Sequence, residues 1–121
     1  MKQREYDKHI IEELEKLPIP LKTFDNHNVL FDQNKRHETI YEHIANKKHH
    51  LHTKDIQQIP KILEQRKNLK KDKKGNKFRT YISKREKQKE RLKYIKITTR
   101  INKNNQESII TINLIKKIID S

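Results

Sequence analysis

Histidine is the residue type in this sequence that most directly suggests chemistry. Six of the seven histidines lie between residues 27 and 52, and two of them, His37 and His43, belong to the segment RHETIYEHI. Imidazole exchanges a proton near neutral pH, so these residues suit general acid–base catalysis. The ordinary alternative is a solvated helix, with His37 partly buried and bonded to backbone and His43 on the surface. The segment alone does not decide between the two.

The segment predicts a helix over about residues 35–48, with Asp32 or Asn34 as its N-cap. On a helix of 3.6 residues per turn, Arg36 and His43 fall within roughly 20° of each other, beside the buried stripe. They can meet a phosphate-binding surface on a sheet only if this helix runs along an edge of that sheet or the sheet curls around the helix. A helix lying over the middle of the sheet would keep them away from its far face.

Metal binding is the competing use of clustered histidines, since imidazole is the commonest metal ligand. The sequence has no cysteine, no HExxH motif and no carboxylates at ligand spacing. The surrounding lysine excess also repels a cation. We therefore predict neither a metal site nor a cofactor.

Positive charge is concentrated in one part of the chain. The formal net charge is +14, and residues 61–103 hold 18 of the 30 basic side chains but only 4 of the 16 acidic ones. A block of this kind attracts a polyanion such as RNA. The ordinary alternatives are a solubilising surface and the Lys-, Asn- and Ile-rich composition of an AT-rich genome.

The spacing of apolar residues predicts helices in the first half of the chain. A first amphipathic helix is expected over residues 5–17, ended by Pro18 and Pro20. Thr53 is placed to cap a further helical segment, in which Pro60 should cause a kink or a break. Strands are predicted over residues 26–31, 77–83, 93–101 and 108–115. We therefore predict an α+β fold, with N-terminal helices packed on a three- to four-stranded antiparallel sheet.

The length of 121 residues predicts a single domain. Only 31% of the residues are hydrophobic, but they cluster in periodic segments, which favours a folded chain. Within the domain, 1–121, we expect three parts. They are an N-terminal helix and connector (1–25), a helical part with RHETIYEHI (26–65) and a basic antiparallel sheet (66–121).

One face of the predicted sheet collects groups that suit phosphate. The isoleucine-rich face, which includes Phe78, Ile82 and Ile110, should pack against the helices. The opposite face then carries Arg79, Tyr81, Lys96, Thr98, Ile109, Thr111 and Asn113. Cations and hydroxyls bind phosphate, and an aromatic ring stacks on a base. An antiparallel sheet can leave one face in water, but the lack of acids on this face favours anion binding.

The order of these segments resembles a known group of nucleases. RHETIYEHI is followed by HHLHTKDIQQIPKIL, a lysine-rich hairpin, FRTYISKR, LKYIKI and ESIITI. Over about residues 28–116 this succession is similar to the small phage- and mobile-element-borne nucleases of the barnase–EndoU–colicin–RelE superfamily. The resemblance implies helices packed on an antiparallel sheet. It also implies metal-independent RNA cleavage, in which the 2′-hydroxyl attacks the adjacent phosphodiester and leaves a 2′,3′-cyclic phosphate.

The resemblance also implies roles for individual residues. It assigns acid–base work to His37 or His43, with Tyr81 as a candidate second proton-transfer group. It assigns phosphate binding to Arg36, Arg85, Lys96 and Thr111, to which the predicted polar face adds Arg79 and Thr98. The sequence departs from barnase-like enzymes because no glutamate stands on the polar face to act as base. The EndoU- and colicin-like members, which work without one, are the closer comparison, and the choice of histidine stays open.

The predicted function is a metal-independent endoribonuclease, acting on RNA such as tRNA as a toxin or mobile-element effector. An acidic antitoxin or immunity protein would neutralise it. The alternative is a non-catalytic basic RNA- or DNA-binding module of a phage or mobile element. A third hypothesis is an interaction subunit held by an acidic partner. The charged N-terminus and the lack of a long apolar run predict a cytoplasmic protein without membrane contact.

Overall fold

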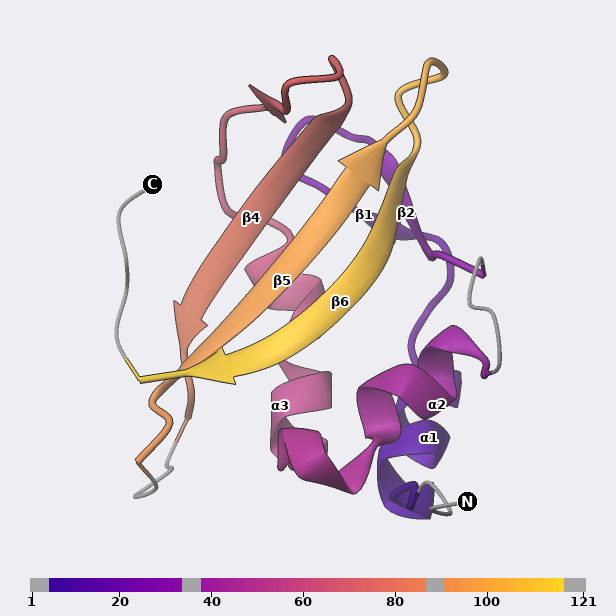
Figure 1. Cartoon of the computed structure of the whole chain (residues 1–121), viewed down its shortest axis with the longest axis vertical. Helices are drawn as coiled ribbons and strands as arrows, with labels where there is room; N and C mark the ends of the chain where they lie inside the picture. The colour runs from indigo at the N-terminus through magenta and orange to yellow at the C-terminus, as the bar shows by residue number, and fades with distance from the viewer. Residues whose placement is uncertain (1–4, 34–37, 87–90, 117–121) are drawn as a thin grey trace.

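The computed structural model describes residues 5–33, 38–86 and 91–116 of the chain. In these ranges, helices pack on one face of a six-stranded sheet (Figure 1). None of the described helices has the length and apolar character needed to cross a membrane. The predicted α+β class is confirmed, although the sheet is larger than expected and mixed rather than purely antiparallel.

Three long strands form the centre of the sheet, and shorter strands extend it on both sides. The strands are β1 (Leu21–Lys22), β2 (Asn28–Phe31), β3 (Lys70–Lys71), β4 (Lys77–Lys84), β5 (Tyr94–Ile101) and β6 (Glu107–Ile115). They are ordered β1-β2-β6-β5-β4-β3. β4, β5 and β6 form the predicted antiparallel meander, whereas β2 joins it by pairing parallel with β6.

The helices are shorter than their sequence patterns. They are α1 (Lys8–Glu15), α2 (Ile40–Ala45), α3 (Thr53–Gln57) and α4 (Ile59–Ile62), with a 3-10 turn, η1 (Lys47–His49), after α2. Thr39 is the N-cap of α2 and forms a capping box with Glu42, so Asp32 is not the cap. Asn34, the other predicted cap, lies outside the described residues. Pro60 stands in the first turn of α4, where its missing N–H is tolerated, and the predicted break is confirmed.

Isoleucine dominates the core between the helices and the sheet. Its buried members include Ile10, Ile40, Ile44, Ile56, Ile59, Ile62, Ile95, Ile97, Ile109 and Ile112. In β5 the predicted alternation is confirmed, because every second residue is buried and the residues between them are not. This alternation fixes which side of the sheet faces the helices.

In β4, the side chains predicted to point toward the helices point outward, and those predicted to point outward point toward the helices. Arg79 and Tyr81 point into the interior and are 2% and 0% exposed, whereas Phe78 points outward. The cause is the strand register, in which Arg79 lies opposite Thr99 and Tyr81 opposite Ile97. Residues paired across antiparallel strands share a face, so the inward residues of β5 bring Arg79 and Tyr81 inward with them.

A β-bulge changes the facing within β6. Thr98 pairs with Thr111, but Thr99 pairs with Ile109, which makes Ile110 the extra residue of the bulge. Ile109 is fully buried and Ile110 only partly. The prediction that Ile110 faces the core and Ile109 faces outward is therefore wrong, while Thr111 keeps its predicted outward direction.

Candidate functional site

We use "outer face" for the side of β4, β5 and β6 that points away from the helices. The register places Thr80, Thr98 and Thr111 side by side on three adjacent strands, and Lys96 lies beside Asn113 in the next row. Neighbouring strands are about 4.8 Å apart, so these hydroxyls and the ammonium group can contact the same stretch of phosphates. The described residues of these three strands place no carboxylate on the outer face. Lys96, Thr98 and Thr111 thus lie together as predicted.

Arg85, which was predicted to hold phosphate, is buried instead. Its guanidinium donates to both carboxylate oxygens of Asp55, at 2.8 and 2.9 Å, and to the carbonyl of Leu92. Arg85 is 4% exposed and Asp55 1%, so this ion pair fastens α3 to the end of β4. Arg36 and His37, two further predicted site residues, lie outside the described residues.

His43 belongs to a separate polar cluster beside α2. Its Nδ1 lies 3.0 Å from Oε1 of Glu38, and the other oxygen of that carboxylate accepts a hydrogen bond from the Tyr6 hydroxyl at 3.2 Å. The His43 side chain is 30% exposed. Glu38 thus holds the ring through Nδ1, which assigns proton exchange to Nε2.

A second histidine completes this cluster. The ring of His49, in η1, has its centroid 5.5 Å from that of His43 at an interplanar angle of 70°. Its Nδ1 lies 3.4 Å from the carbonyl oxygen of Ile44. Burial lowers the pKa of His49, and the charges of His43 and Lys48 act in the same direction. His49 is therefore held in its neutral form near pH 7.

α2 lies next to β6, on the side where β2 ends. α2 contacts β6, and the ring of Tyr41 meets that of Phe31, at the end of β2, edge to face at 5.1 Å. β2 pairs with β6 only up to Ile109, and no described strand continues along that side of β6. Figure 1 shows α2 beyond the end of β2, beside this uncovered stretch.

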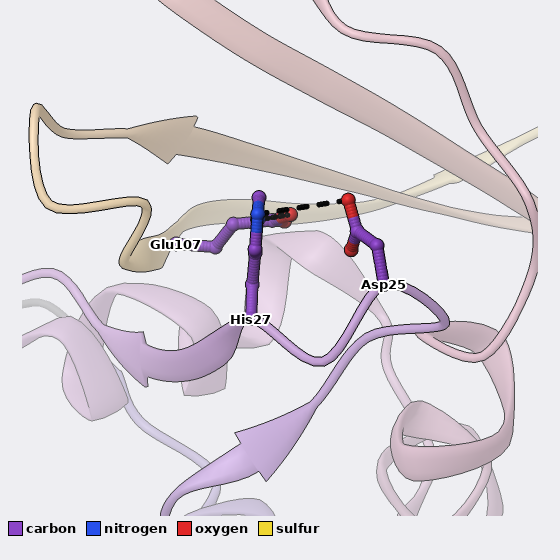
Figure 2. A group of neighbouring side chains, drawn as sticks. All are labelled: Asp25, His27 and Glu107. Atoms are coloured by element: carbon purple, nitrogen blue, oxygen red, sulfur yellow. Dashed lines mark hydrogen bonds and ion pairs between the residues drawn. The ribbon is translucent and has the colours of Figure 1, made fainter.

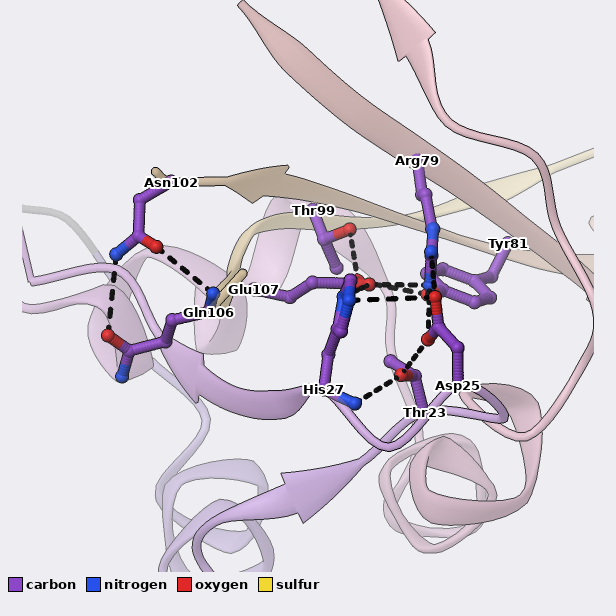
Figure 3. A network of polar contacts seen from close by, with 9 residues as sticks. All are labelled: Thr23, Asp25, His27, Arg79, Tyr81, Thr99, Asn102, Gln106 and Glu107. Atoms are coloured by element: carbon purple, nitrogen blue, oxygen red, sulfur yellow. Dashed lines mark hydrogen bonds and ion pairs between the residues drawn. The ribbon is translucent and has the colours of Figure 1, made fainter. Parts of the chain in front are cut away.

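Arg79 and Tyr81 belong to a buried network beneath the connection between β1 and β2 (Figure 3). The fully buried carboxylate of Glu107 accepts hydrogen bonds from Arg79 Nη1 at 2.6 Å, Tyr81 Oη at 2.9 Å and Thr99 Oγ1 at 2.8 Å. Arg79 also donates to both oxygens of Asp25. The prediction that Arg79 and Tyr81 stand on the open polar face is wrong, because interior acids pair with them.

Arg79 controls ionisation in this network. Its hydrogen bonds to Asp25 hold the pKa of that carboxyl well below its usual range and raise the pKa of Arg79 itself. Burial raises the pKa of Tyr81, so its phenol stays protonated and donates to Glu107. The ring of Phe24 covers the guanidinium, with its centroid 5.1 Å from Cζ.

Asp25, His27 and Glu107 also have the composition of a metal site (Figure 2). One ligand atom from each lies within 4.8 Å of the others. The guanidinium of Arg79, however, already bonds both carboxylates and holds positive charge at the point where a metal would bind. A second cation there would be repelled, so Arg79 supplies the positive charge that this group of ligands requires.

Acid should weaken the contact between Asp25, in the β1–β2 connection, and Arg79 of β4. The pKa of Asp25 is lower in the folded protein than its ordinary 3.8, so its contribution to stability is complete above that value and is lost as pH falls below it. We expect Asp25→Asn to be less stable than the unchanged protein at pH 7 and less sensitive to acid. Urea unfolding between pH 2 and 7 measures both effects, with exposed Glu64→Gln as control. An unchanged acid dependence in Asp25→Asn contradicts this.

The sequence patterns did not identify Glu38, His49, Asp25 or Glu107 as site residues. Glu38 lies five residues before His43, which is no helical spacing, and it meets His43 because α2 begins only after Thr39. Comparisons with protein-family models, with curated proteins and with solved structures found no match.

Proposed function

We propose that this protein is a metal-independent endoribonuclease that binds RNA on the outer face and cleaves it by attack of the 2′-hydroxyl. The observation that carries the proposal is the acid-free group of Lys96, Thr98 and Thr111 on adjacent strands. Ammonium and hydroxyl groups are suitable donors to phosphate oxygens. The net charge of +14 adds long-range attraction for a polyanion.

His43 is the proposed proton-transfer group. Its ring is held by Glu38 and its side chain is 30% exposed, so an RNA strand at the surface can approach Nε2. α2 lies at the edge of the sheet next to β6, the strand that carries Thr111. RNA that crosses this edge would pass from the phosphate-binding groups of the outer face to the histidine.

The decisive experiment is incubation of the purified protein with tRNA and with total RNA, in the presence and absence of EDTA. We expect fragments that end in a 2′,3′-cyclic phosphate and begin with a 5′-hydroxyl, at rates that EDTA does not change. An oligonucleotide with one 2′-deoxyribose at the cleavage position should bind but stay intact, because it lacks the attacking hydroxyl. Products with other ends, or rates that depend on a metal, contradict the mechanism.

The second candidate is a non-catalytic RNA- or DNA-binding module. The observation in its favour is that the described histidine cluster belongs to the helical layer, whereas the proposed phosphate contacts lie on the outer face. This candidate predicts salt-sensitive binding without any cleavage. If neither tRNA nor total RNA is cut while both are bound, this second function replaces the first.

Lys96→Ala should weaken the binding of all RNA sequences alike. Each phosphate contact that a cation makes to a single strand contributes about 0.7 to the slope of log affinity against log salt concentration. We expect the slope to become less negative by about that amount. Fluorescence anisotropy with two unrelated RNA oligonucleotides at several salt concentrations measures it.

The matched control is Lys16→Ala, at the C-cap of α1 in the helical layer, where the ammonium is exposed and lies 3.5 Å from Glu13. This variant should keep the salt slope of the unchanged protein. An unchanged slope in Lys96→Ala, or an equal change in both variants, shows that the outer face is not the phosphate-binding surface.

A further inference from the structure

We propose that His49 is the second catalytic residue of this site, acting as the general base while His43 acts as the general acid. This inference rests on the proposed function and assigns the two proton transfers. It starts from the ring contact, with centroids 5.5 Å apart and planes at 70°. Cleavage through the 2′-hydroxyl needs two such groups, because the attacking and the leaving oxygen stand on opposite sides of the phosphorus.

The two rings have different partners at Nδ1. In the neutral ring of His49, Nδ1–H donates a hydrogen bond to the backbone carbonyl of Ile44, and Nε2 keeps its lone pair. Nδ1 of His43 faces the carboxylate of Glu38, a negative charge that compensates a protonated ring. Both rings therefore have Nδ1 occupied and Nε2 available for proton exchange, and the carboxylate beside His43 makes that ring the one assigned to the acid role.

The surroundings of His49 favour its neutral form on balance. Burial lowers its pKa most and the charges of His43 and Lys48 lower it further, whereas the hydrogen bond to Ile44 and the charge of Glu38 raise it. The hydroxyl of Tyr6 donates a hydrogen bond to Glu38. A base that is neutral at the working pH can accept a proton immediately, which is what general base catalysis requires.

The reaction is balanced with these two residues alone. Nε2 of His49 takes the proton of the 2′-hydroxyl, and the 2′-oxygen forms a bond to phosphorus. The bond from phosphorus to the 5′-oxygen breaks, and that oxygen receives the Nε2 proton of His43. The products are a 2′,3′-cyclic phosphate and a 5′-hydroxyl, with His49 protonated and His43 neutral. Proton exchange with water then removes the proton from His49 and returns one to His43.

A sulfur leaving group separates the two roles. We would use an RNA oligonucleotide with sulfur in place of the scissile 5′-oxygen, because a thiolate leaves without being protonated. On ordinary RNA, His43→Gln and His49→Gln should each lower kcat by about 10²- to 10⁴-fold with little change in KM. On the sulfur substrate, His43→Gln should recover most of its rate, while His49→Gln should stay slow.

The matched control is His50→Asn, the neighbouring exposed histidine, whose φ of 57° asparagine also tolerates. It should cleave both substrates like the unchanged protein, and circular dichroism should show that all three variants are folded. Near-normal cleavage by His49→Gln overturns this inference alone, and recovery of His49→Gln rather than His43→Gln on sulfur overturns the assigned roles. Failure of the unchanged protein to cut either substrate overturns the proposed function together with the inference.

Discussion

Replacing Arg79 with methionine is expected to lower the free energy of unfolding by about 3–5 kcal/mol, the range for removing one partner of a buried ion pair. Most of this loss comes from Glu107, whose carboxylate is fully buried and would lose the cation that compensates its charge. Asp25 contributes less, because its side chain is 31% exposed and can be hydrated. Urea unfolding at pH 7 measures the difference.

The control is Arg100→Met on the outward, exposed side of β5, which should change the free energy of unfolding by no more than about 0.5 kcal/mol. A double variant, Arg79→Met with Glu107→Gln, removes both charges. It should recover part of the loss because no uncompensated buried charge remains. A loss below about 1 kcal/mol in the single variant contradicts the structural role that we assign to this network.

Replacing His43 with glutamine is expected to lower the rate of RNA cleavage by about 10²- to 10⁴-fold while RNA affinity stays nearly unchanged. Glutamine keeps a hydrogen-bonding group near Glu38 but cannot exchange a proton near neutral pH. The phosphate contacts proposed for the outer face lie on the sheet, on residues that this change does not touch. Single-turnover cleavage of a labelled RNA and anisotropy measurements on the same RNA separate rate from affinity.

His9→Gln is the matched control for this prediction. His9 is an exposed histidine on α1, with Nδ1 3.9 Å from Glu12, so it has a histidine's charge and an acidic neighbour without the contact to His49. It should cleave at the rate of the unchanged protein. If His43→Gln cleaves normally, or if both variants lose activity equally, His43 is not the proton-transfer group.

The sequence was sufficient for the α+β class, for the meander of β4, β5 and β6 and for one half of the outer face, but not for β1, β3 or the parallel pairing of β2. Alternation in β5 and the positions of Lys96 and Thr111 could be predicted because apolar and polar residues alternate regularly there. For Arg79 and Tyr81 the local pattern was misleading. Phe78 and its alternate neighbours are the more apolar set, yet pairing with β5 turns them outward.

The burial of Arg79 could not be predicted from the sequence because its partners lie far from it in the chain. The partly exposed Asp25 and the buried Glu107 make it possible to bury Arg79, but they lie 54 and 28 residues away from it in the chain. No local pattern connects such positions. The contact between His43 and His49 is hidden for a different reason, since η1 interrupts the helical spacing between the two residues.

The parallel pairing of β2 with β6 has a consequence for how the protein is made. His27, next to β2, bonds Glu107 across a separation of 80 residues. The first part of the chain therefore cannot complete its contacts until β6, the last described strand, has been made. Contacts of this range are slow to form because a long loop must close first. Synthesis from the N-terminus therefore produces the residues of the histidine cluster early. At that time β6, which α2 contacts, has not yet been made. A protein built in this order completes the outer face and the contact between α2 and β6 only after translation has passed β6.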